Sequence, residues 1–334
     1  MTEQILLTGI TGFIAKHVAL KLLGAGYSVR GTVRRLDRTE EVRAALRPHL
    51  KAEALERLTF AACDLESDMG WDDAMGGITT LVHTASPFPI ALPKDEMTLI
   101  RPARDGTLRV MKVAHAAGVK RIVLTSSTAA VQNGRQGVLS EDDWCDPAVA
   151  GVSAYAKSKV LAERAAWQFA ISAAQALTVI NPGFVLGPPL DGNFGSSIGV
   201  VKRILAGRDP MLPLIGFVCV DVRDVAEMHL RAVQRPETAG KRYMAAAGSL
   251  TMPQMGAILK AAYPARRIPT WTAPKFALQV LALFDAQIRA ILPSVGQLVE
   301  ASNARAVAEM GMEFIAPDAA LLASAEWLVR NGGV

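Results

Sequence analysis

A tyrosine and a lysine four residues apart, near the middle of the chain, could together transfer a proton. The segment SAYAKSK, residues 153–159, contains Tyr155, Lys157 and Lys159. Residues four apart on a helix share a face and residues two apart do not, so we expect Lys159 beside Tyr155 and Lys157 facing elsewhere. A phenol can donate a proton, and a nearby ammonium stabilises the phenolate that remains. The alternative is a buried tyrosine with an exposed lysine.

A glycine loop near the N-terminus could bind a dinucleotide. TGITGFIA, residues 8–15, lies between an apolar strand-like run and a segment with helical spacing. Glycine at Gly9 and Gly12 lets the backbone turn tightly and approach a pyrophosphate, whose charge the helix N-terminus then meets. Ala15 stands where the motif often has a third glycine, and alanine is small enough for that position. The residues that we expect to contact the cofactor here are Thr8, Gly9, Thr11, Gly12, Phe13 and Ile14.

The end of the second expected strand indicates which dinucleotide binds. An NAD enzyme needs an acidic residue there for the ribose 2′-hydroxyl, and an NADP enzyme needs cations for the 2′-phosphate. This chain has GTVRRLDR at residues 31–38, in which Asp37 comes late and is flanked by Arg35 and Arg38. A guanidinium grips phosphate in a fork, so Arg34 and Arg35 are the expected 2′-phosphate ligands and NADPH the expected cofactor. The alternative is a solvated loop.

Two later strand ends carry further candidates for cofactor contacts. CDL at the third strand end offers Asp64 to the adenine amino group and Leu65 to its ring. HTASP closes the fourth strand, and His83 within it is expected to be a core or supporting histidine rather than a catalyst. The residues expected near the nicotinamide ribose are Thr84, Ala85 and Ser86.

Alternating strand and helix patterns position these residues. Apolar runs rich in β-branched residues occur at 4–9, 27–34, 57–63, 79–86, 120–127 and 177–183, with helical spacing between them. This alternation predicts an α/β fold of the Rossmann type, a doubly wound parallel sheet with a smaller C-terminal substrate-binding lobe. We expect a dinucleotide-binding domain over 1–181, to which parts of 215–248 return, and a mainly substrate-binding lobe over 182–334.

Two segments contain residues that conflict with the structure their apolar pattern first suggests. Pro102 and Gly106 would normally interrupt a helix, yet the apolar spacing of 95–118 and the strand that follows predict one. The apolar stretch 276–292 is interrupted by Asp285 and Arg289, which favours amphipathic helix over a membrane span.

The composition fits a globular protein and argues against several other classes of protein. Of the 334 residues, 51% are hydrophobic and 20% are charged, as in a globular protein. The net charge is +5, and most of the basic residues are interleaved with acidic ones, so we expect no nucleic-acid or membrane partner. The three cysteines are far apart, which predicts no metal site and no disulfide framework. We expect a cytoplasmic monomer or homodimer without a targeting segment.

The motifs together resemble the extended short-chain dehydrogenase/reductase superfamily. TGITGFIA, then Ser127 at the end of the fifth strand, then YAKSK occur in that family's order and spacing. Within it the chain is similar to the dihydroflavonol reductase-like branch, which includes NADPH-dependent aldehyde and ketone reductases and the cinnamoyl-CoA reductases. The segments that carry this similarity, over roughly residues 4–230, are VRGTVR, HTASP, RIVLTSS, YAKSKVLAE, NPGFVLGP and VDVRDVAEMH.

The resemblance implies a catalytic triad and a nicotinamide-facing segment. Ser127, the last hydroxyl of its run and so preferred over Thr125 and Ser126, would hold the carbonyl oxygen beside the Tyr155 hydroxyl, with Lys159 as the partner cation. NPGFVLGP would wrap the nicotinamide, with hydride delivered from the pro-S side. The cofactor contacts implied in addition are Tyr155, Lys159, Pro182, Gly183 and Val185.

The expected substrate pocket is apolar, which favours a medium-sized aldehyde, ketone or keto ester over a phosphorylated sugar. For each of its apolar residues, plain core is the alternative. The family patterns also argue against three activities. The chain lacks the NWYCYGK segment of cinnamoyl-CoA reductases at the tyrosine, and it has Gln132 where plant dihydroflavonol reductases usually have an asparagine. It has Thr128 and Ala129 where sugar 4,6-dehydratases have an acidic pair. The residues expected to line the pocket are Phe88, Gln132, Val152, Leu186, Phe194 and Met211.

Three other functions remain as alternatives. A sugar-nucleotide epimerase or a hydroxysteroid dehydrogenase would share the fold, although the arginines at the second strand end count against an epimerase that retains NAD. A non-catalytic NADP sensor would bind a protein partner, and such proteins commonly lack the Tyr and Lys that are present here.

Overall fold

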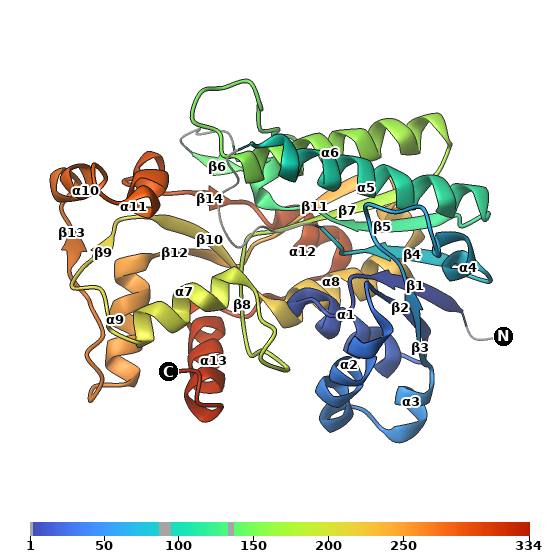
Figure 1. Ribbon diagram of the computed structural model, residues 1–334, viewed down its shortest axis with the longest axis horizontal. Coiled ribbons are helices and arrows are strands. Elements are labelled where there is room, and N and C mark those ends of the chain that lie inside the picture. The colour runs from blue at the N-terminus through green and yellow to red at the C-terminus, as the bar shows by residue number, and fades with distance from the viewer. Residues whose placement is uncertain (1–2, 87–94, 133–136) are drawn as a thin grey trace.

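A seven-stranded parallel sheet forms the centre of the computed structural model, which describes residues 3–86, 95–132 and 137–334 (Figure 1). The strand order is β11-β7-β5-β4-β1-β2-β3. The expected Rossmann-type α/β fold is thus confirmed, and all six expected strands are present. The strands are β1 (Gln4–Thr8), β2 (Ser28–Val33), β3 (Leu58–Ala62), β4 (Thr80–His83), β5 (Arg121–Thr125), β7 (Ala176–Pro182) and β11 (Lys241–Ala245).

The strand order reverses between β1 and β4. From β1 the chain proceeds to β2 and β3 on one side and then returns to build β4, β5, β7 and β11 on the other. Because all neighbouring pairs are parallel, the carboxyl ends of these strands meet at one edge. In open α/β sheets ligands bind in the crevice outside this edge, at the reversal point.

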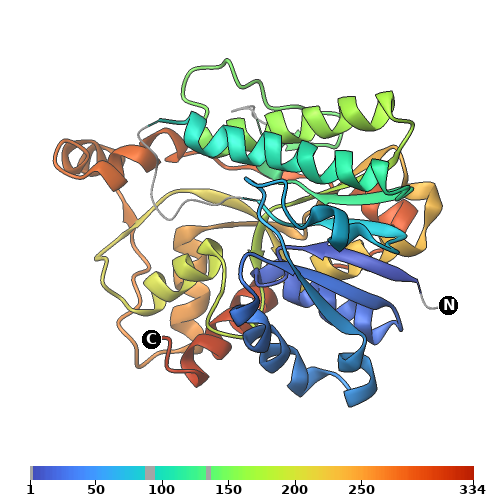
Figure 2. The ribbon, with the colours of Figure 1, turned by 45° about the vertical axis from the view of Figure 1, so that its right-hand side comes forward.

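Helices cover both faces of the sheet (Figures 1 and 2). On one face α5 and α6 lie side by side, and the core beneath them includes Trp71 of α4. On the other face α1 packs against α8, with α2 and α3 beyond it. The bounds are α1 (Phe13–Gly24), α2 (Thr39–Leu46), α3 (Ala52–Glu56), α4 (Trp71–Met75), α5 (Met97–Ala116), α6 (Ala154–Ser172) and α8 (Val222–Gln234).

The predicted helix over 95–118 is present as α5 and contains both expected breakers. Pro102 falls within its first two turns. A methyl group on Gly106 would lie 2.9 Å from the Cβ of Leu65, so the glycine allows the helix to approach the loop after β3. Gly106 therefore serves close packing, and neither residue ends the helix.

The remaining chain forms a smaller lobe beside the carboxyl edge of the sheet. Its three-stranded sheet has the order β12-β10-β8, and two short pairs, β13-β9 and β14-β6, extend the lobe. The strands are β6 (Val138–Leu139), β8 (Phe184–Leu186), β9 (Leu212–Pro213), β10 (Gly216–Asp221), β12 (Gly248–Thr251), β13 (Thr272–Ala273) and β14 (Glu300–Ala301). The remaining helices of the chain are α7 (Ser196–Leu205), α9 (Met252–Ala262), α10 (Lys275–Leu281), α11 (Ala286–Ile291), α12 (Ala304–Met310) and α13 (Pro317–Arg330), of which α12 lies outside the lobe.

Two parts of the late chain return to the large sheet. β11 pairs with β7 at the edge of the sheet, and α12 packs against β11 and α8. The stretch 276–292 forms the short helices α10 and α11 rather than one longer amphipathic helix. In the part of the chain that the structure describes, no helix is long and apolar enough to span a membrane.

Candidate active site

The glycine loop fits closely against the end of β4, at the point where the strand order reverses. Gly9 has φ +69°, a conformation that favours glycine, and a methyl group on it would lie 2.9 Å from the Cα of Ala85. Gly12 is the N-cap of α1 and has no side chain to accept from the first-turn N–H groups. Ala15 is almost fully buried against the sheet. The loop therefore leaves helix N–H groups for an anion, as a pyrophosphate requires.

Thr8 connects the glycine loop to the end of β4 through its hydroxyl. The oxygen accepts from the backbone N–H groups of Thr84 and Ala85 at 3.1 and 3.0 Å, so its proton points to Nδ1 of His83 at 2.8 Å. Nε2 of His83 lies 3.5 Å from the Thr107 hydroxyl. Burial, together with the nearby Lys159 cation, lowers the pKa of His83 to about 3. His83 is thus a neutral supporting histidine, as expected.

A cleft of about 590 Å³ opens at this edge between the glycine loop, β2, β3 and β4. It contains residues expected to bind the adenosine and phosphate parts of the cofactor, together with those expected near the nicotinamide ribose. Those in the lining are Gly9, Thr11, Gly12, Arg34, Asp64, Leu65, Thr84, Ala85 and Ser86. The arrangement of a tight glycine turn, an open helix N-terminus and a basic strand end fits a dinucleotide.

The arginines of β2 and of the turn after it have three different environments. Arg34 and Arg38 line the cleft, and Arg38 also pairs with Glu41 at 2.6 Å. Arg35 is exposed and pairs with Asp37 at 2.6 Å, so it lies outside the lining of the described cleft. Arg30 donates to backbone carbonyls at the end of α4. The structure therefore brings Arg34 and Arg38, rather than Arg35, to the cleft.

Tyr155 and Lys159 share a face of α6. The helix begins at the N-cap Ser153, whose hydroxyl accepts from the Ala156 N–H at 3.2 Å. The Nζ atom of Lys159 lies 5.7 Å from the Tyr155 ring centroid. Lys157 points to another side and pairs with Glu96 of the turn before α5 at 2.8 Å. The helix geometry thus separates the two lysines as expected.

Ser127 follows β5 and faces the same helix. It is 8% exposed and is the N-cap of the short 3-10 helix η3 (Thr128–Ala130), which packs against α6. Its hydroxyl accepts from the Ala129 N–H at 3.1 Å, and its carbonyl accepts from Nδ2 of Asn181 on β7 at 3.2 Å. These contacts fix the backbone of Ser127, while its hydroxyl keeps a proton to donate.

The other expected cofactor residues are not in the cleft lining that the described residues give. Phe13 and Ile14 are in the first turn of α1, Pro182 ends β7, and Val185 is on β8. For Gly183 the structure gives a different reason for glycine than cofactor approach. A methyl group there would lie 2.2 Å from the Val218 carbonyl oxygen, so glycine is needed for the contact with β10.

The expected substrate residues are dispersed. Phe88 lies outside the described residues. Leu186 is fully buried in the main core, and Val152 packs beside Cys145 and Val160 in a small cluster near α6. Gln132 is half-buried after η3. Phe194 contacts Trp327 edge to face at 6.0 Å, and Met211 packs in the lobe cluster around Leu278.

Several contacts at the cleft were missing from the sequence prediction. The Thr32 hydroxyl accepts from the Gly9 N–H at 3.1 Å, and Nδ2 of Asn193 donates to the Thr11 carbonyl at 2.8 Å. Lys16 is buried and pairs with Asp191, and burial lowers its pKa. The segment after β8 is therefore fastened to the glycine loop. The sequence signal is the pair of polar residues Asp191 and Asn193 in PPLDGN, which sequence alone does not connect to residues 11–16.

Comparison with known proteins identifies the family. The profile of the NAD dependent epimerase/dehydratase family matches residues 5–246. Cinnamoyl-CoA reductase 2 of Arabidopsis thaliana is 34% identical, over 80% of each chain, and anthocyanidin reductase of Vitis vinifera is 32% identical over 78% of this chain and 81% of its own. The crystal structure of yeast methylglyoxal/isovaleraldehyde reductase complexed with NADPH superposes with a TM-score of 0.82 at 25% identity, covering 99% of this chain and 100% of that one. The chain belongs to the NAD dependent epimerase/dehydratase family, the extended short-chain dehydrogenase/reductases, and within it is similar to the dihydroflavonol reductase-like reductases, as its motifs indicated.

Proposed function

We propose that this protein is an NADPH-dependent carbonyl reductase that reduces a medium-sized aldehyde, ketone or keto ester. One observation carries the proposal: Lys159 lies beside the Tyr155 ring on α6, the helix against which η3, capped by Ser127, packs. The reductases among its relatives support the same class of reaction, including one whose structure contains NADPH.

In the proposed reaction the cofactor, when bound, supplies hydride to the carbonyl carbon. The carbonyl oxygen then gains negative charge and needs a hydrogen bond and a proton. Ser127 donates the hydrogen bond and holds the oxygen near the Tyr155 hydroxyl. Tyr155 transfers its proton to that oxygen, and the Lys159 cation stabilises the phenolate.

Cofactor choice in this proposal depends on the cations at the end of β2. No acid lies in the sequence between the end of β2 and Leu36, and Arg34 and Arg38 line the cleft. Guanidinium groups bind phosphate in a bidentate manner, which favours the 2′-phosphate of NADPH over the free hydroxyl of NADH.

The direct experiment is a spectrophotometric screen with NADPH and a set of aldehydes, ketones and keto esters. We expect oxidation of NADPH with at least one of them and, where the substrate is a prochiral ketone, a single alcohol enantiomer as product. Tight NADPH binding without turnover of any carbonyl would instead favour the non-catalytic sensor.

A further inference from the structure

A buried carboxylate lies two helical turns beyond the tyrosine and is not part of the proposed proton transfer. Glu163 is on α6, four residues after Lys159 and eight after Tyr155, so it follows the same face of the helix. Its residue exposure is 1%. A buried charge is costly unless it is paired and hydrogen-bonded, which makes the partners of this side chain informative.

Four side chains donate to this carboxylate. Oε2 accepts from the Ser126 hydroxyl at 2.5 Å and from Nδ2 of Asn181 at 2.8 Å. Oε1 accepts from Nε of Arg242 at 2.6 Å and from Nε1 of Trp167 at 3.3 Å. Trp167 is on α6 itself, whereas the other three come from the carboxyl end of β5, from β7 and from β11. The Glu163 side chain therefore connects three strands by hydrogen bonds to the helix that carries Tyr155 and Lys159.

Two of these donors also fix the backbone of Ser127. Ser126 is its neighbour in sequence, and the Ser126 N–H donates to the Ile180 carbonyl of β7 at 2.8 Å. Asn181 uses the same Nδ2 group for Glu163 and for the Ser127 carbonyl. The position of Ser127 relative to α6 therefore depends on hydrogen bonds that converge on Glu163.

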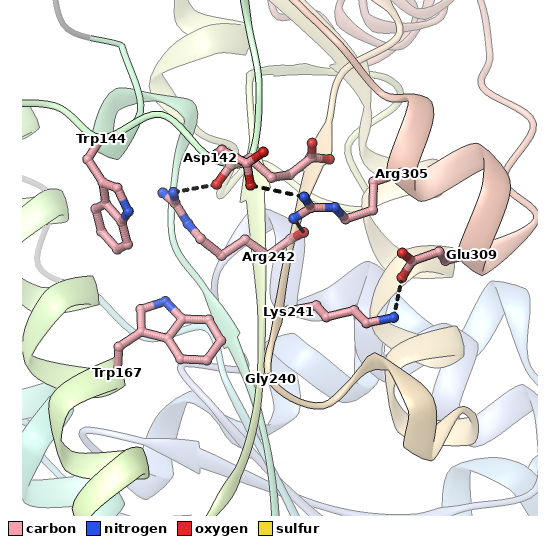
Figure 3. Close-up of a pocket in the computed structure, with 9 residues that line it drawn as sticks. Asp142, Trp144, Trp167, Gly240, Lys241, Arg242, Arg305 and Glu309 are labelled. Atoms are coloured by element: carbon pink, nitrogen blue, oxygen red, sulfur yellow. Dashed lines mark hydrogen bonds and ion pairs between the residues drawn. The ribbon is translucent and has the colours of Figure 1, made fainter.

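Arg242 supplies the counter-charge. It is 6% exposed, its Nη1 donates to the carbonyls of Glu141 and Asp143 at 2.8 Å each, and its guanidinium lies 3.8 Å from the Trp144 ring centroid. Figure 3 shows Arg242 and Trp144 beside a cavity of about 490 Å³ at this edge of the sheet. The guanidinium is thus held in place from the side away from Glu163.

We propose that Glu163 is a positioning residue that sets the Ser127 hydroxyl against the Tyr155 hydroxyl, in the reaction proposed above on which this inference rests. Glu163→Gln tests it with almost no change in size. A carboxamide has only one oxygen, so its NH₂ group would meet either Asn181 and Ser126 or Arg242 and Trp167, all of which donate to the carboxylate. At least one strand then loses its connection to α6.

The test is a double-mutant cycle with Ser127→Ala, measured as kcat for NADPH oxidation with a carbonyl that the wild type reduces. If Glu163 acts through Ser127, Glu163→Gln should lower kcat about tenfold in the wild-type background, which is the scale expected for a misplaced catalytic group. In the Ser127→Ala background the same substitution should lower kcat less than about twofold. Equal losses in both backgrounds would show a general structural effect and overturn the inference. The NADPH dissociation constant should change less than about twofold.

A matched control is Glu309→Gln. Glu309 also accepts from the edge strand, at 2.8 Å from Lys241 and 2.6 Å from Tyr243, but these bonds join β11 to α12. We expect this variant to lose some stability and to keep kcat within about twofold of the wild type. If Glu163→Gln does not fold, Ser126→Ala removes one donor with little change in volume, and the same cycle with Ser127→Ala applies.

Hydrogen exchange gives a readout without turnover and separates this inference from the proposed function. The Ala129 and Ala130 N–H groups donate to the Ser127 hydroxyl and carbonyl, respectively. In the Glu163→Gln protein we expect these amides to exchange about tenfold faster than in the wild type or in Glu309→Gln. Unchanged exchange of these amides in the Glu163→Gln protein would overturn the inference, even if the wild type reduces carbonyls. Faster exchange in the Glu163→Gln protein, together with no carbonyl reduction by the wild type, would overturn only the proposed function.

Discussion

The Lys159 ammonium lies 5.7 Å from the Tyr155 ring centroid, whereas Lys157, on the same helix, pairs with Glu96 at 2.8 Å. The two lysines have the same chemistry and differ only in the helix face that they occupy. They therefore provide a variant and its control within five residues of the chain.

Removal of the Lys159 charge should slow turnover, and removal of the Lys157 charge should not. We expect Lys159→Met to lower kcat by about two orders of magnitude, because the phenolate that forms as Tyr155 gives up its proton loses its cation. Lys157→Met removes an ion pair with a largely exposed partner and should leave kcat within about twofold. Steady-state rates of NADPH oxidation measure both, and similar losses in the two variants would contradict the assignment.

The arginines after β2 should differ in their contribution to cofactor choice. Arg34 lines the cleft, so Arg34→Ala should raise the KM for NADPH about tenfold or more, the scale of a lost charge-assisted hydrogen bond, and leave the KM for NADH nearly unchanged. Arg35 is engaged with Asp37 outside the lining, so Arg35→Ala should have a smaller effect. Unchanged ratios of NADPH to NADH use in an Arg34 and Arg35 double variant would refute the NADPH preference.

Gly183 should tolerate no side chain, because its neighbour is backbone. A methyl group there would lie 2.2 Å from the Val218 carbonyl oxygen, and β8 or β10 would have to move. We expect Gly183→Ala to lower the free energy of unfolding by about 2 kcal/mol or more. Gly199→Ala, in α7 with open space around it, should instead raise it by about 0.5–1 kcal/mol. Urea unfolding of both variants makes the comparison.

Acid should destabilise the protein through its buried histidines. Burial lowers the pKa of His17 to about 4 and of His229 to about 4, and burial with the Lys159 cation lowers that of His83 to about 3. Below pH 6.5 these histidines bind protons in the unfolded chain but stay neutral in the folded protein. The free energy of unfolding that they contribute above pH 6.5 is therefore lost as the pH falls towards 4. Asp224, whose pKa burial raises to about 6, opposes this over part of the range.

His17 allows the contribution of one of these groups to be isolated. Its Nε2 lies 3.0 Å from the Pro188 carbonyl, and Gln at this position keeps a donor without a titratable ring. His17→Gln should reduce the pH dependence of the unfolding free energy by about 1.4 kcal/mol per pH unit near pH 5, which corresponds to one proton. His49, which is exposed, provides the control, because His49→Gln makes the same substitution at the surface.

The strands and the glycine loop could be predicted because local signals define them. Each of the six strands is an apolar run bounded by turn residues, and the loop follows the first of them directly. The helix at 97–116 was predictable from spacing even with Pro102 and Gly106 inside it, but the partner that makes Gly106 useful, Leu65, is far away in sequence.

Other parts of the site depend on contacts that the order of residues does not contain. Asn193 reaches the Thr11 carbonyl across 182 positions, and Arg242 of the edge strand reaches Glu163 of α6. The choice between Arg35 and Arg38 depends on which neighbouring acid each arginine pairs with, Asp37 or Glu41, and on the turn between them. An apolar residue type does not tell whether a side chain lines a pocket or packs in the core, and Leu186, expected in the pocket, lies in the core.

The central claim is that Tyr155 gives the proton to the reduced carbonyl, and Tyr155→Phe tests it most directly. The measurement is kcat for NADPH oxidation with a carbonyl that the wild type reduces, alongside NADPH binding. We predict a fall in kcat of about two orders of magnitude or more, with the NADPH dissociation constant within about twofold of the wild type. Near-normal turnover by the Tyr155→Phe protein would contradict the account.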